Sequence, residues 1–204
     1  MNRQTHMSLN NIIQNATQTL VNHLEELTAL DQAIGDGDHG LNMKRGAQAI
    51  QAKLPEMESM ALNDALKTMG KTCVAMIGGS SGPVFGTLLI TLGKELPENP
   101  SAGDVALALR ASIEALTRLG KAQVGQKTLL DVLDPVQRVL AEGGPNLLAR
   151  VRQCGFDSAI ATADMDATRG RSSFLGDRAK GHIDPGSRSM ALIIGSVCDS
   201  LSQP

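Results

Sequence analysis

Residues 9–46 read LNNIIQNATQTLVNHLEELTALDQAIGDGDHGLNMKRG and contain the two features around which the rest of the chain is organised. In the first part, apolar side chains recur every three or four residues, which is typical of an amphipathic helix. These residues are Leu9, Ile12, Ile13, Ala16, Leu20, Leu24 and Leu27. In the second part, aspartates alternate with glycines. The stretch therefore predicts one amphipathic helix that ends in an acidic loop.

The helical period continues along the chain. It recurs in residues 61–77, 105–119, 129–140, 147–163 and 190–197, whereas alternating strand patterns are absent. Breakers separate the helical stretches. Pro55 is expected to end a helix begun after Asn42, and Asp184-Pro185 is typical of a helix start. We predict an all-α fold of about eight helices whose short loops make neighbours antiparallel.

Composition limits the classes of protein to which the chain can belong. It has 204 residues, 19 Lys+Arg against 21 Asp+Glu, and 1% aromatic residues. That balance argues against binding to nucleic acid, and no apolar run is long enough for a membrane span. Three distant cysteines indicate free thiols rather than a disulfide framework. We expect a cytoplasmic protein with a single domain over residues 9–204, preceded by a tail of residues 1–8.

The acidic loop contains three carboxylates within eight residues, Asp31, Asp36 and Asp38. Two carboxylates about 4 Å apart repel by about 4 kcal/mol at an effective dielectric near 20. If the side chains converge, a cation must offset this repulsion, and ligands that are all oxygen favour Mg²⁺ or Ca²⁺. The favoured interpretation is an Mg²⁺ site that bridges to phosphate. The alternative that spacing alone leaves open is a solvated turn rich in Asp and Gly.

Two other interpretations of this loop are weaker. Gly35, Gly37 and Gly40 match the spacing of the dinucleotide fingerprint, but a helix precedes them and the aspartates would repel a bare pyrophosphate. An EF-hand counted from Asp36 would need a glutamate at its twelfth position, where Ala47 stands.

Three later stretches could contact an anion. Residues 78–83, GGSSGP, precede a helix and could present backbone N–H groups. Residues 120–128 resemble a phosphate-binding P-loop, but an extra residue before Lys127 and the lack of a preceding strand exclude it. Arg169, Arg171 and Arg178 could bind phosphate through their guanidinium groups, although an ordinary charged loop remains an alternative.

Taken together, these stretches resemble the nucleotide-binding L subunits of bacterial dihydroxyacetone kinases of the phosphotransferase-system type. The resemblance runs from about Leu9 to Leu201. It is most specific in LDQAIGDGDHGLNMKRG, GGSSGPVFGT, GQKTLLDVLDPV and TRGRSSFLGDRAKGHIDPGS, which occur in that order. The resemblance implies eight antiparallel helices in an up-and-down barrel, with a nucleotide at one end.

The resemblance also implies a set of site residues. Asp31, Asp36 and Asp38 would hold two Mg²⁺ ions and would be the residues that catalysis can least spare. The phosphates of ADP or ATP would lie against His39, Gly40, Leu41, Asn42, Ser80 and Ser81. The adenine pocket would include Gly120 and Leu129, and Arg171, Asp184, Pro185 and Gly186 would close over the nucleotide. Gly37 departs from the family, where a small residue other than glycine often stands.

By resemblance, the reaction is phosphoryl transfer to dihydroxyacetone held on a separate subunit. A phosphohistidine carrier subunit fed from phosphoenolpyruvate would rephosphorylate the bound ADP. Three alternatives stay open: a subunit that serves another short ketose or polyol with ATP directly, an Mg-ADP-dependent binding module that docks on a transcriptional regulator, and a helical bundle without a ligand. A homodimer is also left open.

Overall fold

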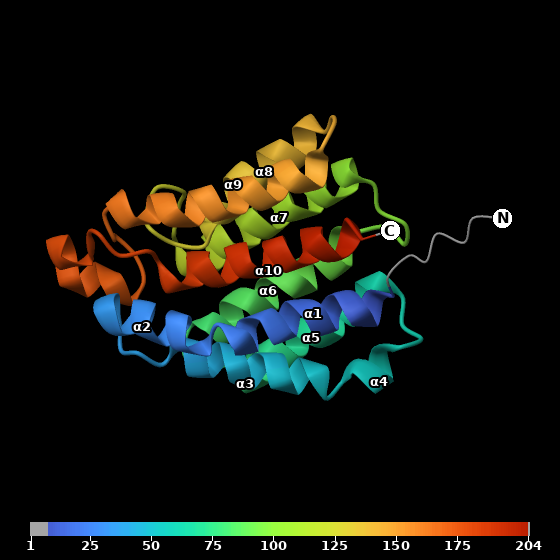
Figure 1. Ribbon diagram of the computed structural model, residues 1–204, viewed down its shortest axis with the longest axis horizontal. Coiled ribbons are helices and arrows are strands. Elements are labelled where there is room, and N and C mark those ends of the chain that lie inside the picture. The colour runs from blue at the N-terminus through green and yellow to red at the C-terminus, as the bar shows by residue number, and fades with distance from the viewer. Residues whose placement is uncertain (1–7, 204) are drawn as a thin grey trace.

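The chain folds into helices that lie side by side along one long axis (Figure 1). The computed structural model describes residues 8–203, and within that range it contains helices, turns and loops but no strand. The α-helices are α1 Leu9–Asn22, α2 Leu24–Ile34, α3 His39–Gln51, α4 Leu54–Met57, α5 Leu62–Met76, α6 Ser81–Glu95, α7 Ala102–Gly120, α8 Leu130–Glu142, α9 Leu147–Ala161 and α10 Pro185–Leu201. Two 3-10 helices, η1 Thr162–Asp164 and η2 Arg171–Ala179, lie between α9 and α10.

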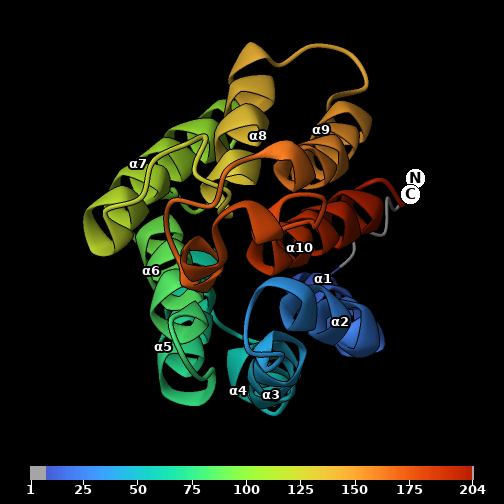
Figure 2. The ribbon, with the colours of Figure 1, turned by 90° about the vertical axis from the view of Figure 1, so that its left-hand side faces the viewer.

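The predicted all-α class is confirmed. If α1 and α2 are taken together and the single turn of α4 is set aside, eight long segments remain, as predicted. Their packing follows a cyclic order, in which α1 contacts α3, each later long helix contacts the next, and α10 returns to α1. Figure 2 shows this arrangement from one end of the bundle. The cyclic order agrees with the expected barrel, which itself stays a prediction.

The prediction was wrong about two helix boundaries. The first amphipathic stripe is not one helix, because the chain breaks at His23, whose ring Nδ1 lies 2.8 Å from the Thr19 carbonyl oxygen. The three- and four-residue repeat of apolar side chains continues on both sides of His23, so the sequence pattern does not reveal the break. Pro55 does not end α3, which already stops at Gln51; it lies in the first turn of α4, where its missing N–H has no cost.

Two other boundary predictions can be compared with the structure. Asp184 is the N-cap of α10 as expected, and its carboxylate accepts a hydrogen bond from the Ser187 N–H at 2.7 Å. Residues 1–7 of the predicted tail lie outside the described residues, while Ser8 belongs to the helix cap because its hydroxyl accepts the Asn11 N–H.

The core between the helices is aliphatic. Leu27, Ala65, Val132 and Ala191 are completely buried, and Met43 and Met57 fill irregular space among them. Burial of one such leucine contributes about 1.5–3 kcal/mol. All three cysteines are free, and burial raises the pKa of the Cys73 thiol to about 12. Across residues 8–203, every helix is too short or too polar to cross a bilayer.

The up-and-down direction of the helices brings several helix starts to one end of the bundle. Because neighbours run up and down, α3, α6, α8 and α10 all begin at the end of the bundle where α2, α5, α7 and α9 finish (Figure 1). That end therefore collects four helix N-termini, and loops that are far apart in sequence meet there.

Candidate functional site

A cleft of about 320 Å³ opens at the end of the bundle where these four helices begin. Its floor comes from the α2–α3 loop and the first turn of α6. The first wall is the loop of residues 121–129 between α7 and α8, and the second wall is the segment of residues 162–184 between α9 and α10. The start of α10 closes the remaining side. Segments from the whole length of the chain thus share one cavity.

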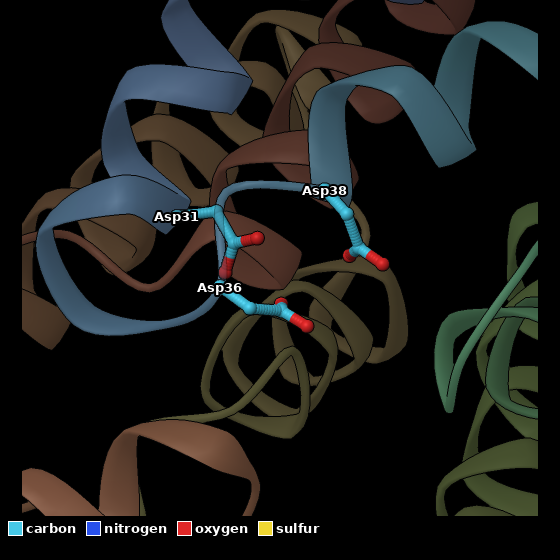
Figure 3. Close-up of side chains that lie close together, drawn as sticks. All are labelled: Asp31, Asp36 and Asp38. Carbon is cyan, nitrogen blue, oxygen red and sulfur yellow. The ribbon is translucent and has the colours of Figure 1, made fainter.

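Three carboxylates meet at this cleft. Asp31 lies on the last turn of α2 and is buried, whereas Asp36 and Asp38 lie on the following loop and are exposed. One oxygen from each side chain lies within 4.8 Å of the others. Figure 3 shows all three carboxylates turned toward the same space. At such separations they repel one another, so the arrangement suits a divalent cation.

Glycine allows the α2–α3 loop to bring these groups together. A Cβ on Gly35 would lie 2.0 Å from Oδ1 of Asp31, so any larger residue would displace that carboxylate. Gly37 has a φ of +78°, a left-handed conformation that glycine adopts without strain. The departure from the resembled family at Gly37 therefore has a backbone reason in this chain.

His39 links three elements beneath the cleft. Its backbone N–H donates to Oδ2 of Asp31 at 3.0 Å, which fixes that carboxylate at the start of α3. Its ring Nε2 lies 2.8 Å from the hydroxyl of Ser189 on α10, and its Nδ1 lies 3.3 Å from the hydroxyl of Ser81 on α6. Burial lowers the pKa of His39, although Asp31 and Asp38 act in the opposite direction. Burial therefore favours the neutral ring, which connects α3 to α6 and α10.

The helix N-termini give the cleft an affinity for anions. The first residues of α3, α6, α8 and α10 all line it, and unpaired backbone N–H groups at a helix start carry partial positive charge. Neither α3 nor α6 has a side-chain bond from its own N-cap residue, although the His39 N–H at the start of α3 is already bonded to Asp31. Carboxylates beside four positive helix ends form a site for a cation and an anion together.

Buried polar side chains organise the two walls. In the first wall, Asp131 is buried and accepts the backbone N–H groups of Gly125 and Thr128. In the second wall, the hydroxyl of buried Thr162 accepts the Asp184 N–H at 3.0 Å. Burial raises the pKa of Asp184 to about 6, although the bonds from Ser187 and the nearby Lys127 oppose the increase.

Most of the site residues predicted from sequence lie around this cleft. Those that line it are Asp31, Asp36, Asp38, His39, Asn42, Ser80, Ser81, Gly120, Leu129, Asp184, Pro185 and Gly186. Gly40 and Leu41 do not line it. Gly40 packs against α2, where a Cβ would lie 2.4 Å from the Leu24 carbonyl oxygen, and Leu41 is half exposed. The side chain of Arg171 lies outside the described residues.

The cleft also contains residues that the sequence did not single out for it. Val84, Phe85, Leu116 and Ala122 form an apolar part of the lining, and Lys127 is fully buried beside them. The apolar residues carry no distinguishing signal, because they read as core positions of helices. Lys127 lies within the rejected phosphate-loop match and within the stretch GQKTLLDVLDPV, neither of which assigns its side chain a role.

Comparisons with known proteins identify the family of this chain. A DAK2 domain profile matches residues 33–199. The chain is 40% identical over 82% of both lengths to the ADP-binding subunit DhaL of PEP-dependent dihydroxyacetone kinase 1 from Listeria innocua. It is 35% identical to the corresponding Escherichia coli subunit, over 83% of this chain and 85% of that one.

The fold has a solved counterpart. The dihydroxyacetone kinase of C. freundii, determined in complex with AMP-PNP and Mg²⁺, superimposes with a TM-score of 0.76 at 23% identity. The match covers 98% of this chain and 36% of that one, so the shared fold is one part of a longer kinase. Cleft, fold and matching profile lead to one assignment: this chain belongs to the DAK2 domain family.

Proposed function

We propose that this chain is the nucleotide-binding subunit of a dihydroxyacetone kinase that works by phosphoryl transfer with separate partner subunits. The observation that carries the proposal is the convergence of Asp31, Asp36 and Asp38 beside four helix N-termini in one cleft. This combination suits a metal-bound nucleoside diphosphate, because the metal balances the carboxylates and the helix ends balance the phosphates.

The donor set fits magnesium. All three side chains offer oxygen, and the glycines of the loop let these oxygens approach one another without a cysteine or histidine in the cluster. We propose that the three aspartates hold two Mg²⁺ ions. When bound, these ions would neutralise charge on the phosphate oxygens, which is the main requirement of phosphoryl transfer.

The remaining lining suggests how a nucleotide lies. We propose that Ser80 and Ser81 at the start of α6, with Asn42 of α3, contact phosphates near the aspartates, while His39 holds Asp31 in position. The apolar lining that includes Leu116, Ala122 and Leu129 suits a purine ring. Asp184, Pro185 and Gly186 border the same cleft, so the start of α10 would limit escape of the nucleotide.

The relatives suggest the partners. Those from Listeria innocua and Escherichia coli are named as ADP-binding subunits of PEP-dependent dihydroxyacetone kinases. We infer that a phosphohistidine carrier phosphorylates ADP held by this chain, and that the phosphoryl group then passes to dihydroxyacetone on another subunit. Docking on a transcriptional regulator and a homodimer remain predictions.

Calorimetry tests the binding step. The protein is titrated with ADP in the presence of Mg²⁺ and again in EDTA, together with the Asp38→Asn variant. We expect tight binding only with Mg²⁺ and wild-type protein. The nucleotide-free variant should be at least as stable as wild type, because it loses carboxylate repulsion and no helix-cap bond. Asp157→Asn, on the exposed face of α9, serves as the control.

Equal affinity for ADP in EDTA would contradict the metal bridge. The transfer step is tested by mixing the chain with a ketose-binding subunit and a phosphorylated carrier, with dihydroxyacetone, erythrulose or no sugar. We expect dihydroxyacetone phosphate to form only when all components are present. Transfer from free ATP without the carrier would instead favour the kinase that uses ATP directly.

A further inference from the structure

Lys127 is an unusual residue for the wall of an open cleft. Only 1% of its surface is exposed, and it is the largest of the completely buried side chains in the described range. Lysine is seldom buried to this extent unless its ammonium group is paired. Its backbone φ of +60° turns the chain sharply at this position. The proposed function gives this side chain no role.

The ammonium group of Lys127 binds the backbone of the opposite wall. Its Nζ donates to the carbonyl oxygens of Thr162 at 2.5 Å, His182 at 2.7 Å and Ala163 at 3.4 Å. These carbonyls stand at the two ends of the second wall. The Lys127 side chain of the first wall therefore links the two ends of the second wall by hydrogen bonds to their backbone carbonyls.

The same three bonds exclude direct contact with phosphate as its role. An ammonium group has three donors, and all three are directed at these carbonyl oxygens. Burial lowers the pKa of Lys127, whereas Asp184, Asp164 and Asp166 oppose that effect. Carbonyls and distant carboxylates thus stabilise the charge without a ligand.

Hydrogen bonds within the first wall connect Lys127 to residues that line the cleft. Asp131, at the start of α8, accepts the N–H groups of Gly125 and Thr128 on either side of Lys127. The loop is consequently one hydrogen-bonded unit from residue 125 to residue 131. Leu129 and Leu130 of that unit line the cleft on one side, while Gly170 and Ser172 of the second wall line it on the other.

We propose that Lys127 is a positioning residue that fastens the two walls of the cleft to each other, and that this fastening sets the residence time of the bound nucleotide. The inference rests on the proposed function for the identity of the ligand. The coupling of the two walls does not depend on the proposed function, because the bonds of Lys127 are present in the nucleotide-free chain. On this proposal the nucleotide leaves when the walls separate, and separation would break the bonds of Lys127 to Thr162 and His182.

Release of a fluorescent ADP analogue measures the effect. The Lys127→Met variant keeps the length of the stem and removes the donors, so Mg-ADP analogue should dissociate roughly tenfold faster or more, the factor that corresponds to losing one hydrogen bond of a charged group. Lys127→Arg keeps charge and donors and should restore much of the residence time.

Lys180→Met is the matched control. Lys180 also belongs to the second wall, but its ion pairs with Asp166 and Asp177 stay within that wall. We expect wild-type dissociation from this control. Lys127→Met with wild-type dissociation, or Lys127→Arg no better than Lys127→Met, would overturn the proposal. A role confined to folding would lower the melting temperature of the nucleotide-free Lys127→Met chain and leave its dissociation rate unchanged.

Hydrogen exchange on the wild-type, nucleotide-free chain keeps the proposal testable if Lys127→Met does not fold. The amide of Thr128 is bonded within the first wall and that of Gly181 to Ala163 within the second. Fastened walls open together, so these amides should show the same opening free energy. Clearly different values would overturn the proposal. Failure of the wild type to bind Mg-ADP would overturn the proposed function instead.

Discussion

The α2–α3 loop and the second wall border the same cleft, but they are held in place differently. In the loop, the deciding hydrogen bond joins Asp31 to His39, eight residues apart. In the second wall, the bonds from Lys127 reach Thr162 and His182, which are 35 and 55 residues away. One region is shaped by its own short sequence, whereas the other is shaped by a distant loop. Mutations within the α2–α3 loop should therefore change that loop directly. The second wall should also respond to mutations in the distant loop that contains Lys127.

The strongest local disruption is expected from Gly35→Ala. The new methyl group would lie on Oδ1 of Asp31, so the carboxylate must leave its place and its bond to the His39 N–H. Loss of a hydrogen bond that orients a metal ligand typically reduces metal affinity by about 10- to 100-fold. We expect Mg-dependent ADP affinity to fall by at least that factor in calorimetry, while circular dichroism still shows a helical chain.

Gly103→Ala is the control for this substitution. A Cβ at Gly103, in the first turn of α7, would meet only the Ser101 hydroxyl at 3.7 Å, which is an ordinary contact. Its affinity for ADP should match that of wild type. If Gly35→Ala binds Mg-ADP normally, the close approach at Asp31 does not matter for the site.

The same contrast explains what the sequence could predict. Asp31, Asp36 and Asp38 are close in sequence, so their convergence needs only a glycine-rich turn, and the pattern predicts it. Contact of Gly40 with phosphate stays a prediction, and the structure adds a second reason for glycine at this position, because it lets α3 approach α2. Lys127 could not be assigned, because neither its burial nor its distant carbonyl partners follow from local spacing.

A smaller effect is expected from Thr162→Val, which weakens the second wall from within. The substitution keeps the shape of a completely buried side chain but removes the hydroxyl that accepts the Asp184 N–H. An amide left without its partner costs about 1–3 kcal/mol. We expect that loss in chemical denaturation, with a several-fold faster release of Mg-ADP.

Thr72→Val gives the comparison for Thr162→Val. The hydroxyl of buried Thr72 donates to the Thr68 carbonyl oxygen within α5, far from either wall in the sequence. It should leave nucleotide release unchanged. Equal release rates for wild type and Thr162→Val would show that the second wall does not control escape of the nucleotide.

The last expected effect is a pH dependence that separates two helix starts. The pKa of Asp184 is about 6 in the folded chain against 3.8 ordinarily, so the folded chain binds this proton more tightly than the unfolded chain does. Its contribution to stability is complete below about pH 4 and is lost as the pH rises to about 6. Asp184→Asn keeps an N-cap side chain and should gain most over wild type above pH 6.

Asp104 at the start of α7 should behave in the opposite way. Hydrogen bonds from the Ser101 side chain and backbone lower the pKa of Asp104, so its contribution is present at neutral pH and is lost as the pH falls through the lowered pKa. Denaturation of nucleotide-free Asp104→Asn should show its deficit at neutral pH and a shrinking deficit in acid. If the two variants share one pH profile, burial by the second wall does not distinguish Asp184 from an exposed cap.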